Sequence, residues 1–189
     1  ILAVGYLGTR QLNLRGDREV KTPADLAGVK LRMPSSDTWL FLGKALGANP
    51  LPLAFGEIYT ALQTGAIDGQ DNPLPTVRAA KFYEVTNQIV LTDHLVDAIF
   101  LSLAGSTWNK LDDKQKQAVL EAAQAAVAFN NEGRINEERQ LAADFAQMGL
   151  KVYRPDVEAF RAHVQKAYLE SDLSKSWPKG MVERINAVK

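Results

Sequence analysis

The sequence predicts an α/β protein in which a small sheet is flanked by helices and followed by one long helix. Short runs of strand length alternate with helical segments over residues 1–105, and this alternation favours the α/β class. Residues 112–149 then contain no proline and a single interior glycine, Gly133, as expected for a long helix. Apolar residues make up 46% of the chain and charged residues 23%, which is enough apolar sequence for a folded core and rules out general disorder.

The first elements are predicted to be two strands separated by a long loop. Residues 1–7 form a short apolar run, whereas residues 8–28 are polar and contain several glycines and a proline, which predicts a loop. Residues 29–33 alternate apolar and basic side chains. This alternation predicts a half-buried strand that carries Lys30 and Arg32 on one face.

A tight turn and a helix are predicted directly after this second strand, as in half of a βαβ unit. Pro34 ends the strand, and Ser35 or Ser36 is expected to cap a helix that runs to about Leu46. Gly47 is suited to the left-handed conformation that commonly ends a helix.

The middle of the chain is predicted to hold short strands, two helices and a proline-rich turn. The expected strands are 51–53, 67–69, 88–91 and 99–104, and the expected helices are 55–63 and 75–84. Asn72 precedes Pro73 in a stretch rich in turn-forming residues, so it is expected to lie in a turn.

Helices dominate the prediction for the rest of the chain. A continuous helix over the 38 residues 112–149 would be about 57 Å long, so we expect it either to cross between two lobes or to break near Gly133. Its polar residues form a continuous face, which indicates that it lies on the surface. A strand at 151–153, a helix capped by Asp156 and a terminal helix over 178–188 complete the predicted elements.

The composition excludes several classes of function. Twenty-two Lys and Arg balance twenty-two Asp and Glu, so the basic excess of a typical nucleic-acid-binding protein is absent. The chain has no cysteine and two histidines, His94 and His163, neither of them in the context of a catalytic or metal site. Phosphate-binding glycine motifs are also absent from the sequence. We therefore predict no catalytic residue, no metal and no cofactor.

Arg32 is the first candidate for ligand binding. It ends a strand immediately before a helix, and ligands of open α/β sheets bind at this edge. A guanidinium beside the N–H groups of a helix that starts near Ser35 would receive a carboxylate. From position alone, an exposed or salt-bridged arginine is the simpler interpretation, and Arg10, Asn72 and Phe55 are equally ambiguous.

Several long stretches of the sequence resemble those of a known family. They are KTPADLAGVKLRMP (21–34), LGANP (46–50), AFGEIYTALQTG (54–65), IDGQDNP (67–73), KFYEV (81–85) and WNKL (108–111). In this order they resemble the substrate-binding proteins of TRAP transporters, the DctP-like periplasmic receptors for organic acids. The resemblance implies a periplasmic-binding-protein-like fold, with a small mixed sheet flanked by helices. It also implies that residues 1–105 form the ligand-binding lobe and that the long helix and the helices of residues 106–189 span to the other lobe.

The resemblance also assigns roles to the ambiguous residues. It implies that Arg32 pairs bidentately with the ligand carboxylate and that Asn72 contacts the same region. Arg10 is implied to assist, and Phe55 to pack against the ligand. Ser35 is a weaker candidate for a polar contact.

The function implied is capture of a small organic acid in the periplasm and its delivery to the permease subunits of a membrane transporter. The acid could be a C4-dicarboxylate, a sugar acid or another small oxo- or hydroxy-acid. Family members carry a further stretch before the strand that opens this sequence. We therefore expect an incomplete cleft and self-association through exposed sheet edges. The alternatives are a self-associating interaction lobe without ligand, and an enzyme acting on organic acids, which the shortage of His and Cys disfavours.

Overall fold

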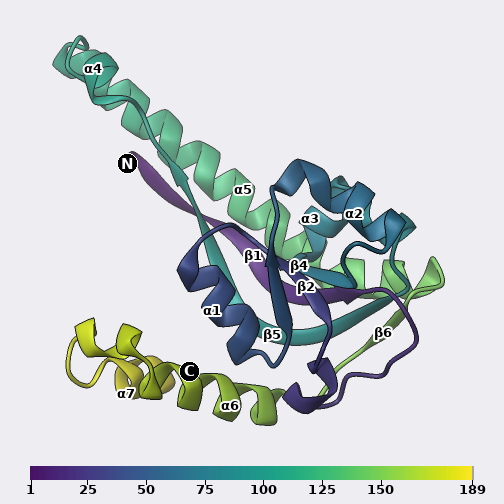
Figure 1. The fold of residues 1–189 in the computed structure, drawn as a ribbon. Helices are drawn as coiled ribbons and strands as arrows, with labels where there is room; N and C mark the ends of the chain where they lie inside the picture. Colours follow the sequence, from purple (N-terminus) through teal and green to yellow (C-terminus); the bar gives the residue numbers. More distant parts are fainter. Residues whose placement is uncertain (189) are drawn as a thin grey trace.

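The computed structural model describes residues 1–188, which form a six-stranded mixed sheet with helices on both faces (Figure 1). The strands are β1 (Ala3–Leu14), β2 (Lys30–Met33), β3 (Asn49–Pro52), β4 (Gly69–Pro73), β5 (Gln88–Leu101) and β6 (Lys151–Tyr153). The α-helices are α1 (Asp37–Ala45), α2 (Ile58–Thr64), α3 (Leu74–Ala79), α4 (Gly105–Trp108), α5 (Asp113–Gln147), α6 (Val157–Glu170) and α7 (Met181–Asn186). Short 3₁₀ turns cover Pro23–Leu26, Phe55–Glu57, Phe82–Glu84 and Asp172–Ser176.

The strand order is β3-β2-β4-β1-β5-β6, and both parallel and antiparallel pairs occur. Strand β2 runs parallel to β3 and β4, and β5 runs parallel to β6. Strand β1 is antiparallel to both of its neighbours, β4 and β5. The predicted α/β class and the strand–turn–helix unit formed by β2 and α1 are confirmed.

Strands β1 and β5 are longer than the sequence predicted. Strand β1 continues to Leu14, although a loop was predicted from residue 8, and β5 is one strand where two were expected. The polar residues that suggested a loop, Arg10, Gln11 and Asn13, are buried in the sheet and hydrogen-bonded there. Their partners are distant in sequence, so a local polarity pattern could not reveal the strand.

The turn predicted around Asn72 was also wrong, because residues 69–73 form the central strand β4. All five residues are buried, and they pair with β1 on one side and β2 on the other. Glycine, asparagine and proline are common in turns, but pairing on both sides satisfies this backbone as a strand.

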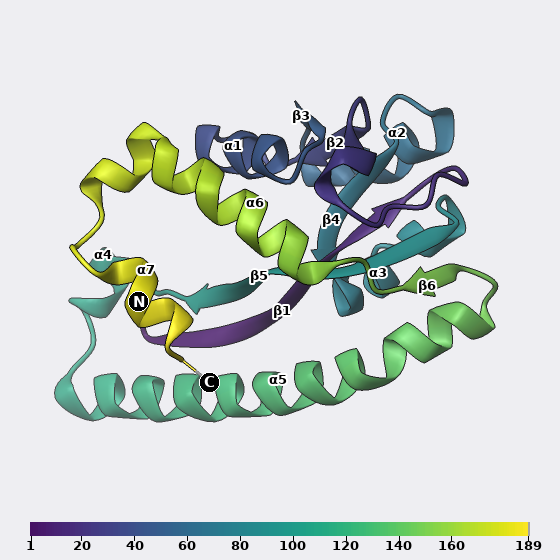
Figure 2. The same ribbon diagram turned by 90° about the horizontal axis from the view of Figure 1, so that it is seen from below.

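Helix α5 is continuous for 35 residues and passes through Gly133 without the break that one of our alternatives allowed. Asp112 caps its start by accepting a hydrogen bond of 2.7 Å from the backbone N–H of Gln115. Its first half projects beyond the sheet together with the outer ends of β1 and β5 (Figures 1 and 2). Its second half returns to the sheet, where Leu141 and Phe145 are fully buried.

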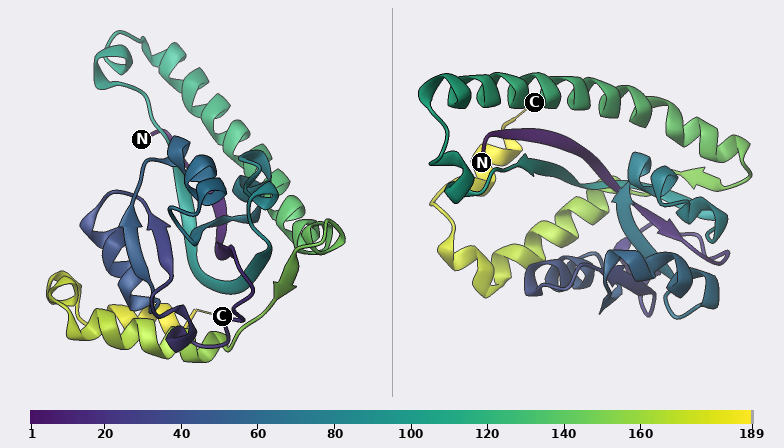
Figure 3. Two further views of the ribbon diagram at one scale, coloured as in Figure 1. Left: turned by 45° about the vertical axis from the view of Figure 1, so that its right-hand side comes forward. Right: turned by 90° about the horizontal axis from the view of Figure 1, so that it is seen from above.

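Two apolar clusters hold the helices on opposite faces of the sheet. Leu42 of α1 and Phe160 of α6 pack with β1 and β2, whereas Leu62 of α2 and Phe145 of α5 belong to the second cluster. Figure 3 shows the long strands between α5 on one side and α6 on the other. No helix within residues 1–188 is both long enough and apolar enough to cross a membrane.

Gly8 is required where β1, β4 and α5 meet. Its φ is +142°, and a Cβ atom there would lie 2.4 Å from both Glu138 Oε1 and Pro73 Cβ. We expect Gly8→Ala to lower the free energy of unfolding by about 2 kcal/mol, because it adds a clash to a backbone conformation unfavourable for alanine.

The matched control is Gly16→Ala. Gly16 also has a positive φ, +80°, but the position that an alanine methyl group would take there has no neighbouring atom within 4 Å. The control is expected to lose about 1 kcal/mol, from backbone strain alone. Urea unfolding measures both values, and equal losses would show that the close approach at Gly8 is unimportant.

Candidate functional site

Three of the predicted binding residues come together at one end of the central strands. Strands β2 and β4 are parallel, and their register places Arg32 opposite Gln70. Asn72 lies two residues further along β4. Strand β1 runs in the opposite direction, and its register places Arg10 opposite Pro73. The site therefore lies where β2 and β4 end, at the edge where α/β sheets bind ligands (Figure 1).

Arg32 is a buried cation without an acidic partner. It is 4% exposed, and its Nε donates a hydrogen bond of 2.8 Å to the carbonyl of Leu53. Within residues 1–188, its two Nη atoms have no hydrogen-bond acceptor, and no Asp or Glu forms a salt bridge with it. Burial lowers the pKa of Arg32, the charge of Asp71 raises it, and the charge of Arg10 lowers it again.

The Nη groups of Arg32, which have no acceptor within residues 1–188, are chemically suited to a carboxylate. No fully buried side-chain nitrogen or oxygen in the described chain lacks a hydrogen-bond partner, so these two Nη atoms are not completely sealed from solvent. The N–H groups of a guanidinium can donate to both oxygens of a carboxylate at once. Such a partner also offsets the desolvation cost of a buried cation.

Arg10, in contrast, is paired with two acidic side chains. Its Nε donates to Asp71 Oδ2 and its Nη1 to Asp97 Oδ2, both at 2.7 Å, and its Nη2 donates to the Asp71 carbonyl at 2.7 Å. The guanidinium also lies 4.5 Å from the centre of the Trp39 ring. Burial lowers the pKa of Arg10, but the charges of Asp71 and Asp97 outweigh this effect and raise it.

Asp71 and His94 are part of the site, although the sequence did not mark them as candidates. Asp71 is fully buried, and its Oδ2 lies 3.3 Å from Nε2 of His94, whose Nδ1 is 2.7 Å from the Thr92 hydroxyl. Burial raises the pKa of Asp71, but the hydrogen bond with His94 and the charge of Arg10 together lower it to about 2. The position of Asp71 directly before Asn72 is the signal that could have identified it.

Asn72 is buried within a row of amide side chains. Its Nδ2 donates to Gln70 Oε1 at 2.6 Å, and Gln70 Nε2 donates to Asn13 Oδ1 at 3.2 Å. These bonds fix the orientation of the Asn72 side chain, which is a condition for precise ligand recognition.

The remaining two candidates lie at the rim. Phe55 lies two residues after Leu53, whose carbonyl accepts the hydrogen bond from Arg32. It is 49% exposed, and the centre of its ring is 5.7 Å from the centre of the Phe82 ring. Ser35 is exposed, and the residue at the N-cap of α1 is Ser36. Of the two serines proposed as the cap, the structure therefore selects the second.

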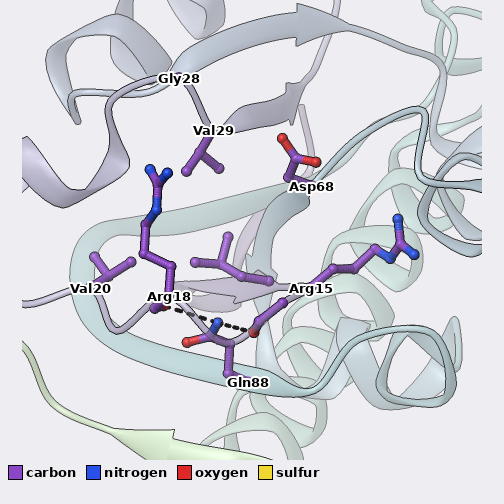
Figure 4. A pocket seen from close by; sticks show the side chains of 9 residues that line it. Arg15, Arg18, Val20, Gly28, Val29, Asp68 and Gln88 are labelled. Carbon is purple, nitrogen blue, oxygen red and sulfur yellow. Dashed lines mark hydrogen bonds between the residues drawn. The ribbon is translucent and has the colours of Figure 1, made fainter.

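A cavity of about 440 Å³ lies at the opposite ends of the same strands (Figure 4). Arg15, Arg18 and Asp68 line it together with Gln88, whose Nε2 donates to the carbonyl of Gly16. None of the predicted binding residues lines it. Elsewhere in residues 1–188, no group of three or more His, Cys, Asp or Glu side chains is arranged to hold a metal ion.

Comparison with known proteins identifies the family. The family model of the bacterial extracellular solute-binding proteins of family 7, DctP, matches residues 1–174. The chain belongs to this family. The family resemblance noted in the sequence is thereby confirmed.

The relatives are binding proteins rather than enzymes. The chain is 38% identical over 173 residues to the sialic acid-binding periplasmic protein SiaP of Vibrio cholerae, matching 92% of this chain and 53% of that protein. A TRAP periplasmic solute-binding protein of Roseobacter denitrificans, solved with bound 3-deoxy-D-manno-oct-2-ulosonic acid, is 53% identical with a TM-score of 0.94. The match covers all of this chain and 63% of that one. A second Roseobacter denitrificans structure, with bound L-galactonate, is 35% identical with a TM-score of 0.83 and covers 90% of this chain and 56% of that one. The chain thus spans about half the length of the curated relatives it matches.

The low pKa of the buried Asp71 carboxylate predicts that the folded protein loses stability at acidic pH. Its pKa is about 2 in the folded protein and near its ordinary value of 3.8 in the unfolded chain, so the unfolded state takes up the proton first as the pH falls. We expect Asp71 to contribute about 2 kcal/mol of stability above pH 4 that is lost as the pH falls to about 2.

Urea unfolding measured between pH 2 and pH 5 tests this expectation. Asp71→Asn has no titrating group at this position, so its stability should fall less steeply over the same interval. A variant as pH-sensitive as the original protein would contradict the assignment.

Proposed function

We propose that this chain is the acid-binding part of the periplasmic receptor of a TRAP transporter. It captures a small organic acid through Arg32, and the receptor delivers the acid to a permease in the membrane. The observation that carries this proposal is the buried guanidinium of Arg32, whose two Nη atoms have no acceptor within residues 1–188. No chemical step on the ligand and no cofactor are part of the proposal.

Each of the other candidate residues has a role in this proposal. Asn72 donates to or accepts from the ligand close to its carboxylate, and Phe55 forms an apolar wall beside it. Arg10 has one N–H left after its bonds to Asp71 and Asp97, so it contributes a single hydrogen bond. Ser35, exposed at the start of α1, adds a polar contact.

A sugar acid is the ligand class that we favour. The relatives carry 3-deoxy-D-manno-oct-2-ulosonic acid, L-galactonate or, by name, sialic acid. These compounds share one carboxylate and several hydroxyl groups. One guanidinium without an acidic partner, that of Arg32, opposite Gln70 on the neighbouring strand, is suited to that combination, because amide side chains such as Gln70 and Asn72 can pair with hydroxyl groups.

We further propose that residues 1–105 supply the ligand contacts and that residues 106–189 support them. Helix α5 is bonded to β1, since Tyr6 N donates to Asn131 Oδ1 at 2.7 Å and Thr9 N donates to Glu138 Oε1 at 2.8 Å. These bonds support a role for the helix in connecting the acid-binding part to the rest of a larger receptor.

The test replaces the guanidinium fork by a point charge. Arg32→Lys keeps the positive charge but loses the bidentate geometry, and we expect the dissociation constant for the bound acid to rise about 10- to 100-fold. Isothermal titration calorimetry with 3-deoxy-D-manno-oct-2-ulosonic acid and L-galactonate measures the change.

Arg78→Lys is the matched control, because Arg78 is half exposed and lies 3.6 Å from Asp144, outside the site. It should bind like the unmodified protein, and both variants should unfold at the same temperature as that protein. Unchanged affinity in a folded Arg32→Lys variant would refute the proposed role of Arg32.

A further inference from the structure

Three buried amide side chains form a row across two central strands: Asn13 of β1, and Gln70 and Asn72 of β4. The row lies on the sheet face that also carries Arg32. Residues paired on neighbouring strands share a face, and Gln70 is opposite Asn13 on one side and Arg32 on the other. Strand spacing and rise place the Cα atoms of Asn72 and Arg32 about 8 Å apart, a distance that an arginine side chain can span.

The amide of Asn13 begins the row, and two acceptors determine its orientation. Its Nδ2 donates to the Thr86 hydroxyl at 2.6 Å and to the backbone carbonyl of Gln88 at 3.2 Å. The Thr86 hydroxyl donates its own hydrogen to the Phe82 carbonyl at 2.8 Å, so it can only accept from Asn13. A backbone carbonyl also only accepts. The Asn13 amide therefore turns its NH₂ group to these two partners and its Oδ1 to Gln70.

The orientation of Asn13 determines the orientation of the next two amides. Because Asn13 presents an oxygen, Gln70 donates to it from Nε2, at 3.2 Å, and turns its Oε1 to Asn72. Asn72 in turn donates to that oxygen from Nδ2, at 2.6 Å. Exchanging nitrogen and oxygen in any one of the three amides would set two donors or two acceptors against each other. The positions of Nδ2 and Oδ1 in Asn72 are therefore fixed from within the sheet.

Asn72 Oδ1 is an acceptor that remains available to a ligand. No donor within residues 1–188 is hydrogen-bonded to it. Since no fully buried side-chain nitrogen or oxygen of these residues lacks a partner, Oδ1 is not completely sealed from solvent. The site thus combines the N–H groups of Arg32, which suit a carboxylate, with an oxygen on the neighbouring strand, which suits a hydroxyl group. In an organic acid, the hydroxyl nearest to the carboxylate is one on the adjacent carbon, carbon 2.

We propose that Asn13 and Gln70 are positioning residues that fix Asn72 as a hydrogen-bond acceptor, so that the site selects acids with a hydroxyl group on carbon 2. Arg32 holds the carboxylate, and the hydroxyl donates to Asn72 Oδ1. An acid whose group at carbon 2 can only accept a hydrogen bond meets an oxygen that the row prevents from turning away. This inference rests on the proposed function, because it assumes that Arg32 holds the carboxylate.

The experiment compares acids that differ only at carbon 2. L-Galactonate and the ring form of 3-deoxy-D-manno-oct-2-ulosonic acid both carry a hydroxyl group there, and each is paired with its analogue that has fluorine in its place. Fluorine is similar in size to a hydroxyl group but cannot donate a hydrogen bond. The full-length polypeptide that carries this sequence is titrated with both pairs by calorimetry. We expect the better-bound hydroxy acid to bind at least about tenfold more tightly than its fluorine analogue.

Asn13→Leu removes the start of the row and leaves Asn72 itself unchanged. The amides of Gln70 and Asn72 can then turn over together, so the preference should fall about fivefold, mainly because the fluorine analogue binds better. Gln88→Leu is the matched control. It also replaces a buried amide in the sheet, but that amide is bonded to the Gly16 carbonyl and the Tyr153 hydroxyl, and the backbone carbonyl of residue 88 is retained. The control should keep the preference of the unmodified protein.

The outcomes separate the two proposals. Equal affinity of the unmodified protein for a hydroxy acid and its fluorine analogue, or a preference unchanged in folded Asn13→Leu, would overturn the role of the amide row and leave the receptor function intact. Failure of the unmodified protein to bind either hydroxy acid would overturn the receptor function and this inference with it. The comparison of acids needs no variant, so it tests the inference even if Asn13→Leu does not fold.

Discussion

The arrangement of this site depends on one buried positive charge, that of Arg32, which forms no salt bridge within residues 1–188. Arg32 is held at the end of β2 between Leu31 and Met33, which are both fully buried and fix the strand in the sheet. The backbone of Arg32 is thereby fixed, and the hydrogen bond from its Nε to the Leu53 carbonyl orients the guanidinium. Because desolvation of a cation is costly, burial of Arg32 lowers the stability of the fold, and an anion bound to it would offset this cost.

The two arginines of the site are both buried but differ in their partners. Arg10 is held by Asp71 and Asp97 and lies over Trp39, so its position is determined before any ligand arrives. Arg32 has one carbonyl bond that orients it and two Nη groups without an acceptor within residues 1–188. A site built in this way needs little reorganisation on binding, which favours affinity.

Helix α5 completes the part of the sheet that lacks a neighbouring strand. Strand β4 pairs with β1 as far as Arg10, and beyond that residue the free edge of β1 is met by side chains of the helix. Asn130 Nδ2 donates to the carbonyl of Tyr6 at 2.9 Å, Asn131 accepts from its N–H, and Glu138 accepts from the N–H of Thr9. Side chains of α5 thus make the hydrogen bonds to the backbone of β1 that a neighbouring strand would otherwise make. They also attach the long helix to the strand that carries Arg10.

The sequence by itself determined the α/β class, the unit formed by β2 and α1, the long helix α5 and the position of Arg32 at the end of a strand. These features depend on side-chain periodicity and end signals over a few neighbouring residues, such as Gly47 after α1, whose φ is +98°. The tertiary structure alone decided that β1 continues through polar residues and that β4 replaces a predicted turn. It also decided that Arg10 pairs with two carboxylates, whereas Arg32 forms no salt bridge within residues 1–188. Arg10 finds its partners 61 and 87 residues away, in Asp71 and Asp97. A buried polar side chain is stable only with such partners, and no local pattern records which distant residue will supply them.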